Sequence, residues 1–230
     1  MKTDFNSIAR RLDVYTKHYM INKRRSYSIS YPHKEFECKI KFTSHTLDKI
    51  IRSILASIKE KSIEIDEIVR RQEFHHFYGN KKTHRAFIFL QGSKEVWIKE
   101  KSKNRVVHTH KFNVPILVRK EEKLRPKDLI YSRYFLDTLK WNYVGSFNKK
   151  CIDISFWFNS FLYTITIAES HTGWRKLSQI EIEYDGHAIR TKKPSEKRVL
   201  SLFDEIIPII IPKPARYFTT ETKLEWLQSR

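Results

Sequence analysis

The sequence predicts an α+β protein in which about eight mostly antiparallel strands form a barrel or a strongly curved sheet, with a few helices outside. Two observations predict this fold class. Segments that alternate charged and apolar residues recur along most of the chain, and such alternation is typical of strands with one polar and one apolar face. Other segments carry apolar residues at helical spacing and can cover the apolar faces of those strands.

Two helices and one strand are expected in the first quarter of the chain. Apolar residues recur at helical spacing over 5–19 and again over 47–58, and Thr43 or Ser44 can cap the second helix. Between them, 34–42 alternates strictly and predicts a strand. The amphipathic helix at 47–58 needs a sheet to lie on.

From about residue 63 the pattern becomes that of strands separated by glycine turns. The expected strands are 70–78, 83–90, 95–101, 106–112, 116–121, 151–158, 161–168 and 178–185. Segment 127–144 is ambiguous. A closing helix is expected after Pro194, because apolar residues again recur at helical spacing there.

Composition indicates a folded, intracellular protein with a polyanionic partner. At 230 residues one domain is expected over 1–212, followed by a linker-like tail over 213–230. Forty-five Lys and Arg against 26 Asp and Glu give a net charge of +19, which favours nucleic acid, nucleotides or an acidic membrane surface. The two cysteines favour a reducing compartment, and no run approaches the ~18 apolar residues of a membrane span.

Two alternating segments carry paired carboxylates. On the strand at 34–42, Glu35, Glu37 and Lys39 share one face, and on the strand at 178–185, Glu181 and Glu183 do so. Carboxylates on two strands can surround a hard divalent cation with oxygen. The polar faces of other strands carry Lys99, Lys101, Arg119, Glu121 and Asp153. These faces are either solvated surface or the lining of a wet barrel, and buried charges in a barrel must be paired or must coordinate something.

The motif Glu35-x-Glu37-x-Lys39 resembles the signature of the triphosphate tunnel metalloenzyme superfamily, and the strand with Glu181 and Glu183 resembles its C-terminal acidic strand. The resemblance covers about residues 34–186. It implies an eight-stranded antiparallel β tunnel with outer helices. Within the superfamily the chain is most similar to metal-dependent RNA 5′-triphosphatases of fungal and large-DNA-virus mRNA capping. It departs from the fungal pattern at Gln179, where a third alternating glutamate is common.

The resemblance also implies roles for individual residues. Glu35, Glu37 and Glu183 would hold Mn²⁺ or Mg²⁺. Among the catalytic residues, Glu181 would hold metal-bound waters or orient the attacking one, Asp153 would fix a base or the water, and Lys39 would supply positive charge. The phosphates would bind to Arg85, Lys99, Lys101 and Arg119. Which of Arg119, Arg125 and Arg133 line the tunnel stays open.

The implied activity is removal of the γ-phosphate from 5′-triphosphate RNA, and from nucleoside triphosphates as well. The implied context is a longer viral chain with guanylyltransferase and methyltransferase domains, working in a viral factory or virion, with no membrane partner. Two alternatives stay open: a hydrolase of inorganic triphosphate or nucleotides, or an adenylyl cyclase relative, with the same fold; and a non-catalytic RNA-binding module whose acids face solvent. The chain contains no Gly-x-x-x-x-Gly-Lys loop, which argues against a P-loop site.

Overall fold

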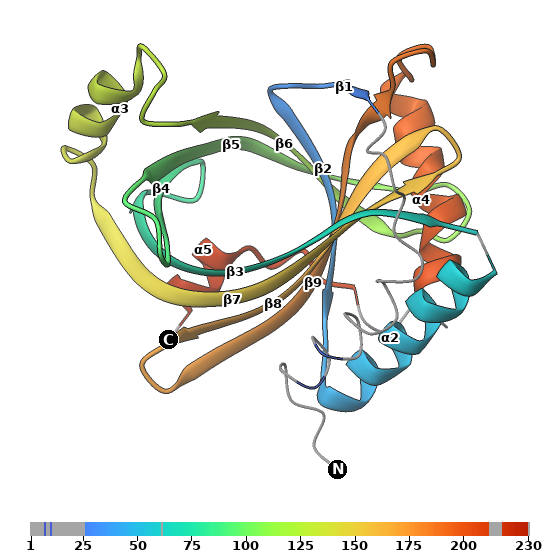
Figure 1. Ribbon diagram of the computed structural model, residues 1–230. Coiled ribbons are helices and arrows are strands. Elements are labelled where there is room, and N and C mark those ends of the chain that lie inside the picture. Colours follow the sequence, from blue (N-terminus) through green and yellow to red (C-terminus); the bar gives the residue numbers. More distant parts are fainter. Residues whose placement is uncertain (1–6, 8–9, 11–25, 61, 212–217, 230) are drawn as a thin grey trace.

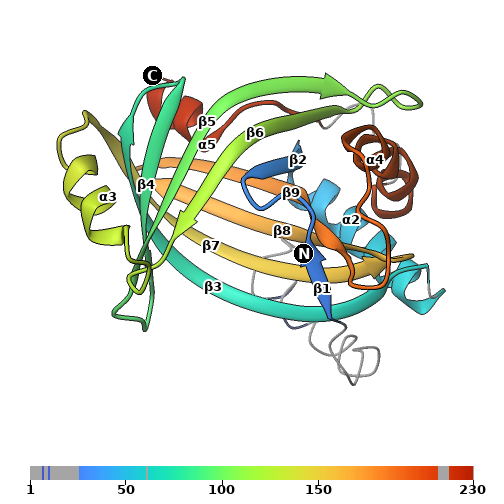
Figure 2. The same cartoon turned by 90° about the horizontal axis from the view of Figure 1, so that it is seen from above.

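The structure is a computed structural model that describes residues 7, 10, 26–60, 62–211 and 218–229. The helix expected over 5–19 falls almost entirely outside these residues. The described part contains a closed barrel, which is seen along its axis in Figure 1 and from above in Figure 2.

Eight long strands build the barrel. They are β2 (Lys34–Lys41), β3 (Glu64–Gly79), β4 (Thr83–Leu90), β5 (Val96–His108), β6 (Pro115–Leu124), β7 (Tyr143–Phe158), β8 (Phe161–Thr172) and β9 (Arg175–Ala188). Their order is β9-β2-β6-β5-β4-β3-β7-β8, and β8 pairs with β9 again, so no edge is left open. Every pairing is antiparallel. The predicted eight-stranded antiparallel tunnel is confirmed.

The short strand β1 (Tyr27–Ile29) was not predicted, and it adds to the end of β9 outside the barrel. Two further differences concern the predicted boundaries. The strands expected at 95–101 and 106–112 are one strand, β5, with an irregular register between Ser102 and Arg105. The ambiguous segment 127–144 contains α3 (Tyr131–Thr138) and the first residues of β7.

The main apolar core lies outside the barrel, beneath α2 (Ser44–Lys59) and α4 (Glu196–Ile210). Apolar side chains from the outer faces of the strands, including Phe36, Ile40 and Ile182, pack there against both helices. Figures 1 and 2 show the two helices together on one side of the barrel. Because these helices take the apolar faces, the charged faces of the same strands point into the barrel.

The tail differs from the linker-like segment expected over 213–230. Helix α5 (Lys223–Gln228) begins with a capping box between Thr222 and Glu225, and Leu224 and Trp226 are buried. They join an apolar cluster with residues of the barrel wall, so residues 218–229 pack against the barrel. Within the described residues, no helix is both long enough and apolar enough to cross a membrane.

Candidate active site

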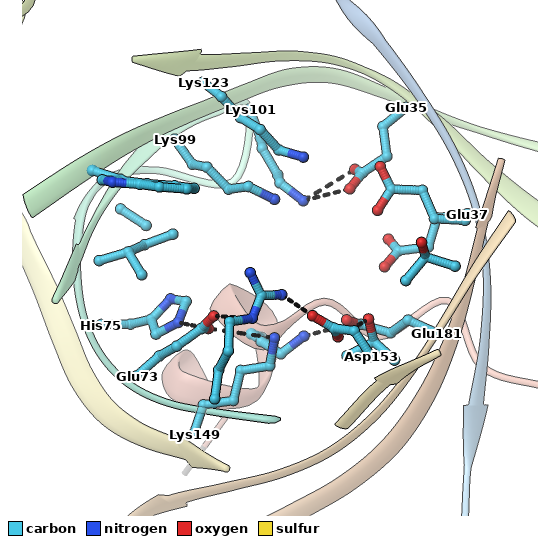
Figure 3. Close-up of a pocket in the computed structure, with 18 of the residues that line it drawn as sticks. Glu35, Glu37, Glu73, His75, Lys99, Lys101, Lys123, Lys149, Asp153 and Glu181 are labelled. Carbon is cyan, nitrogen blue, oxygen red and sulfur yellow. Dashed lines mark hydrogen bonds and ion pairs between the residues drawn. The ribbon is translucent and has the colours of Figure 1, made fainter. Parts of the chain in front are cut away.

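The barrel encloses a cavity of about 340 Å³ that is lined by inward-facing side chains of its strands and by the start of α5. Figure 3 shows that its charged residues come from every side of the barrel. The cavity is lined by every predicted site residue except Arg85: Glu35, Glu37, Lys39, Lys99, Lys101, Arg119, Asp153, Glu181 and Glu183. The polar faces are therefore the lining of a wet barrel rather than solvated surface.

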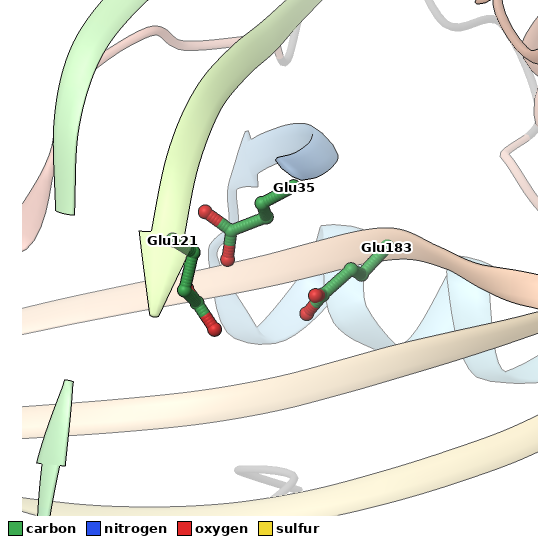
Figure 4. Close-up of side chains that lie close together, drawn as sticks. All are labelled: Glu35, Glu121 and Glu183. Carbon is green, nitrogen blue, oxygen red and sulfur yellow. The ribbon is translucent and has the colours of Figure 1, made fainter. Parts of the chain in front are cut away.

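Three carboxylates from three strands lie close together at the edge of this cavity (Figure 4). Glu35 and Glu183 line it, and Glu121 lines an adjoining cavity that shares both of these residues. Glu35 of β2, Glu121 of β6 and Glu183 of β9 each offer an oxygen atom, and these atoms lie within 4.8 Å of one another. Strand pairing explains the convergence, because β2 lies between β6 and β9. Oxygen ligands at this spacing suit Mg²⁺ or Mn²⁺.

The electrostatics of Glu183 favour a cation at this point. Burial raises the pKa of Glu183 to about 8, and the negative charges of Glu35, Asp185 and Glu121 add to this against the opposing effect of Lys123. A carboxylate that is costly to ionise among other carboxylates is stabilised when a divalent cation neutralises the group. The residues present therefore fit a metal ion.

The composition of this group differs from the predicted ligand set of Glu35, Glu37 and Glu183. The structure brings Glu121, not Glu37, next to the other two. The Glu37 carboxylate is instead 2.7 Å from Nη2 of Arg119 and 2.9 Å from Nζ of Lys39. Glu121 shares a polar face with Arg119 in the sequence, but alternation alone does not show that its carboxylate would lie next to Glu35.

Basic side chains surround the carboxylate group. Lys101 Nζ lies 2.8 Å from Glu35 and 2.7 Å from Glu121, and Lys99 Nζ lies 3.0 Å from Glu121. Arg119 bridges Glu35 and Glu37. Burial disfavours the charge of Lys101, but Glu121 and Glu35 raise its pKa above the ordinary value. The same balance raises the pKa of Arg119, so Lys101 and Arg119 stay protonated and can bind an anion beside the cation.

A second charged cluster contains the other predicted catalytic residues, and Lys39 connects it to the first, because its Nζ contacts both Glu37 and Glu181. Glu181 accepts hydrogen bonds from Lys39, at 2.7 Å, and from Lys223 of α5. Although burial opposes ionisation, Lys223 and Lys39 hold the pKa of Glu181 well below its ordinary value. Asp153 accepts from Arg71 and, at 2.7 Å, from Thr166. Glu181 and Asp153 are therefore held by bases and lie outside the three-carboxylate group.

Several lining residues were not assigned to the site from the sequence. Arg71, Glu73 and His75 lie on the inner face of β3, Lys149 on β7, and Lys123 on β6. The alternation of β3 was a usable signal, because these three residues occupy every second position. No local signal identified Lys223, since it reaches the cavity only through the packing of α5 on the barrel.

Arg85 does not line the cavity. Its side chain faces the outside of β4, where it bonds Glu100 at 2.6 Å and Asp137 at 2.7 Å and packs over the rings of Tyr134 and Trp141. The predicted phosphate contact of Arg85 is wrong for this reason. Its neighbours His84 and Ala86 occupy the inner face, and the side chains of a strand alternate between faces.

Two buried histidines of the lining make stability depend on pH. Burial lowers the pKa of His75 from 6.5 to about 4, against its hydrogen bond with Glu73, and lowers that of His84 to about 3. Below pH 6.5 these histidines therefore become protonated in the unfolded chain while they stay neutral in the folded chain. Stability from these groups is complete above this pH and is lost as the pH falls toward the folded pKa values.

At about pH 5, His75 should lower the free energy of unfolding by about 2 kcal/mol relative to neutral pH. Urea unfolding of the wild type and of His75→Phe at the two pH values measures this. The phenyl ring keeps the stack on Phe147, whose centroid is 4.8 Å away, and removes the titration. Equal pH slopes for the two proteins would contradict the assignment of His75.

No protein-family model and no curated protein sequence matches this chain. Its structure is similar to that of HpAC1 from Hippeastrum, described as an adenylyl cyclase candidate with a dominant triphosphatase activity, at 14% identity and a TM-score of 0.51, covering 84% of this chain and 95% of that one. It is also similar to the Pct1 RNA triphosphatase of S. pombe, at 10% identity and a TM-score of 0.49, covering 92% and 98%. A third similar structure is the Mimivirus capping enzyme triphosphatase, at 14% identity and a TM-score of 0.46, covering 90% and 97%. At these identities the likeness is one of fold, and with the closed barrel it shows that this chain has the triphosphate tunnel fold.

Proposed function

We propose that this chain is a metal-dependent triphosphatase that removes the γ-phosphate from 5′-triphosphate RNA and also hydrolyses nucleoside triphosphates. One observation carries the proposal: Glu35, Glu121 and Glu183 form a cation site inside a closed barrel, directly beside Lys99 and Lys101. Clustered carboxylates and bases in one cavity suit a metal-bound anion. The triphosphatase activity described for HpAC1, which has the same fold, supports the reaction type.

The three carboxylates would hold Mn²⁺ or Mg²⁺, which when bound polarises a γ-phosphate oxygen and neutralises charge. Phosphoryl transfer proceeds through a loose transition state, so positioning and charge neutralisation account for most of the acceleration. Lys101 and Arg119 hold their protons and supply fixed positive charge next to the carboxylates. Glu181 stays ionised, because Lys223 and Lys39 lower its pKa, and can accept a hydrogen bond from the attacking water.

RNA is proposed as the main substrate because of the charge of the chain. A net charge of +19 attracts a long polyanion over many phosphates, whereas the cavity binds the triphosphate end of the chain. The non-catalytic RNA-binding alternative required solvent-facing acids, and the side chains of Glu35 and Glu37 are only 3% exposed. The product would be an RNA 5′-diphosphate, the substrate that a capping guanylyltransferase needs. Fusion to such a domain, and a viral factory or virion as the location, stay predictions.

Release of labelled γ-phosphate from triphosphate RNA, with and without Mn²⁺, tests the function. We expect release only with metal, and a kcat/KM that favours RNA over ATP at low salt. Rising salt should reduce RNA hydrolysis more than ATP hydrolysis, because RNA releases more counterions on binding. Strong hydrolysis of inorganic triphosphate with none of RNA would favour the alternative hydrolase. Salt-sensitive RNA binding that ignores EDTA, without phosphate release, would favour a binding module.

A further inference from the structure

One end of the cavity has an apolar wall that phosphate binding does not use. Ile88 and Leu90 of β4, Trp97 of β5 and Leu224 of α5 line it. Ile88 and Trp97 are direct cross-strand partners, and both contact an apolar cluster that continues into the barrel wall. A triphosphate and a cation need charged and polar partners, so this wall indicates an additional, apolar part of the ligand.

The apolar wall is continuous with the row of bases on β5. Trp97, Lys99 and Lys101 occupy alternate positions and all line the cavity. Lys101 follows Trp97 by four positions, which is about 13 Å along the strand. Lys101 contacts Glu35 and Glu121 of the cation site. Figure 3 shows Lys99 and His75 on the side of the cavity opposite Glu37 and Glu181. A ligand anchored at the carboxylates and extended along β5 therefore reaches the indole.

Trp97 can offer an aromatic surface to such a ligand. The guanidinium of Arg125 lies 4.9 Å from the centroid of the Trp97 ring, and Arg125 is not a lining residue of the cavity. The indole itself is a lining residue and is only partly buried. Aromatic rings that are held in place in this way serve as stacking platforms for nucleobases.

The opposite mouth is unsuited to an RNA chain. A second cavity, of about 370 Å³, shares Glu35, Lys123, Glu183 and Asp185 with the first and extends from the cation site to Tyr27 and Ile29 of β1. Its remaining lining includes the acids Glu121 and Glu122 and the basic residues His33 and Lys34. Five carboxylates and two lysines line this mouth, so phosphates beyond the cation site are repelled there, and the chain of an RNA substrate would leave the tunnel past Trp97.

We propose that the cavity wall at Trp97 and Ile88 is a nucleoside-binding site for the 5′-terminal nucleotide of the substrate. The base stacks on Trp97, Lys99 contacts the inner phosphates, and the γ-phosphate lies at Glu35, Glu121 and Glu183. The inference rests on the proposed triphosphatase function and adds the part of the substrate that the metal and the bases do not hold. Because stacking tolerates every base, all four nucleotides should be accepted.

Comparison of ATP with inorganic triphosphate tests this site, because only ATP carries a base. In Trp97→Ala the KM for ATP should rise by roughly ten-fold or more, and that for inorganic triphosphate by less than about two-fold. Trp97→Phe keeps an aromatic ring and should recover most of the ATP affinity. The matched control is Trp174→Ala, since Trp174 is 93% exposed at the turn between β8 and β9 and should leave both substrates unaffected.

Equilibrium binding separates this inference from the proposed function. If the wild type hydrolyses neither substrate, the proposed function fails. Calorimetric binding of ATP and inorganic triphosphate then tests whether the nucleoside site exists. The nucleoside site would still be supported if the wild type binds ATP more tightly than inorganic triphosphate, Trp97→Ala loses this preference, and Trp97→Phe keeps it. An equal loss for both ligands in Trp97→Ala and Trp97→Phe would show a structural role for Trp97 instead. Unchanged ATP affinity in Trp97→Ala would overturn the site.

Discussion

Replacing Glu35, Glu121 or Glu183 by alanine should reduce metal-dependent release of the γ-phosphate by roughly a hundred-fold or more. Each residue supplies one of three carboxylate oxygens that lie within 4.8 Å of one another. Loss of one oxygen ligand weakens a small cation site, and it leaves the neighbouring bases without their counter-charge. Phosphate release at saturating Mn²⁺, together with calorimetric Mn²⁺ affinity, measures the effect.

The matched control is Glu100→Gln, because Glu100 lies on β5 between Lys99 and Lys101 but bonds Arg85 outside the cavity. It should keep wild-type Mn²⁺ affinity. Glu37→Ala separates the two ligand sets. We expect Glu37→Ala to lose less Mn²⁺ affinity than Glu121→Ala, because Arg119 and Lys39 bind the Glu37 carboxylate. The reverse order of affinities would favour the ligand set that the family resemblance implied.

Lys101→Ala should slow phosphate release by roughly ten- to hundred-fold while the metal stays bound. Lys101 is the base that contacts two of the three carboxylates, so its charge lies next to the expected γ-phosphate. Its loss removes charge stabilisation that strengthens as the phosphoryl group separates. Single-turnover kinetics at saturating Mn²⁺ isolate this chemical step.

Lys120→Ala is the control for charge alone. Lys120 lies on β6 beside Arg119 and is exposed, so its removal lowers the net charge by the same amount outside the cavity. It should leave single-turnover rates unchanged. If Lys101→Ala and Lys120→Ala behave alike, the inner face of β5 does not act on the phosphates.

Alternation along each strand predicted most of the candidate site. On β2, Glu35, Glu37 and Lys39 alternate with apolar residues, and the apolar set is what α2 and α4 bury. The remaining face had to enclose the charges, and the cavity lining confirms it for Glu181 and Glu183 as well. Local periodicity suffices here because a strand with one wholly apolar face has one favourable orientation.

Strand β4 shows where this reasoning fails. It reads Thr83-His84-Arg85-Ala86-Phe87-Ile88-Phe89-Leu90, so both of its faces carry apolar residues. Phe87 packs outside against Phe135 of α3, whereas Ile88 lines the cavity. When both faces of a strand are apolar, periodicity does not show which one points into the barrel. In β4 the packing of α3 on the outer face determines this orientation. Arg85 was therefore assigned to the wrong side.

The sequence by itself determined the strands with one charged and one apolar face and the helices that cover the apolar faces, because each follows from a residue pattern within one element. The family resemblance added the closed tunnel, and the pairing of β8 with β9 confirms it. Only the tertiary structure decided which charges meet. Glu121 joins Glu35 and Glu183 because β2 lies between β6 and β9. Lys223 reaches Glu181 because α5 packs on the barrel, 42 residues further along the chain. Such contacts depend on strand order and on long-range packing, which no local periodicity encodes.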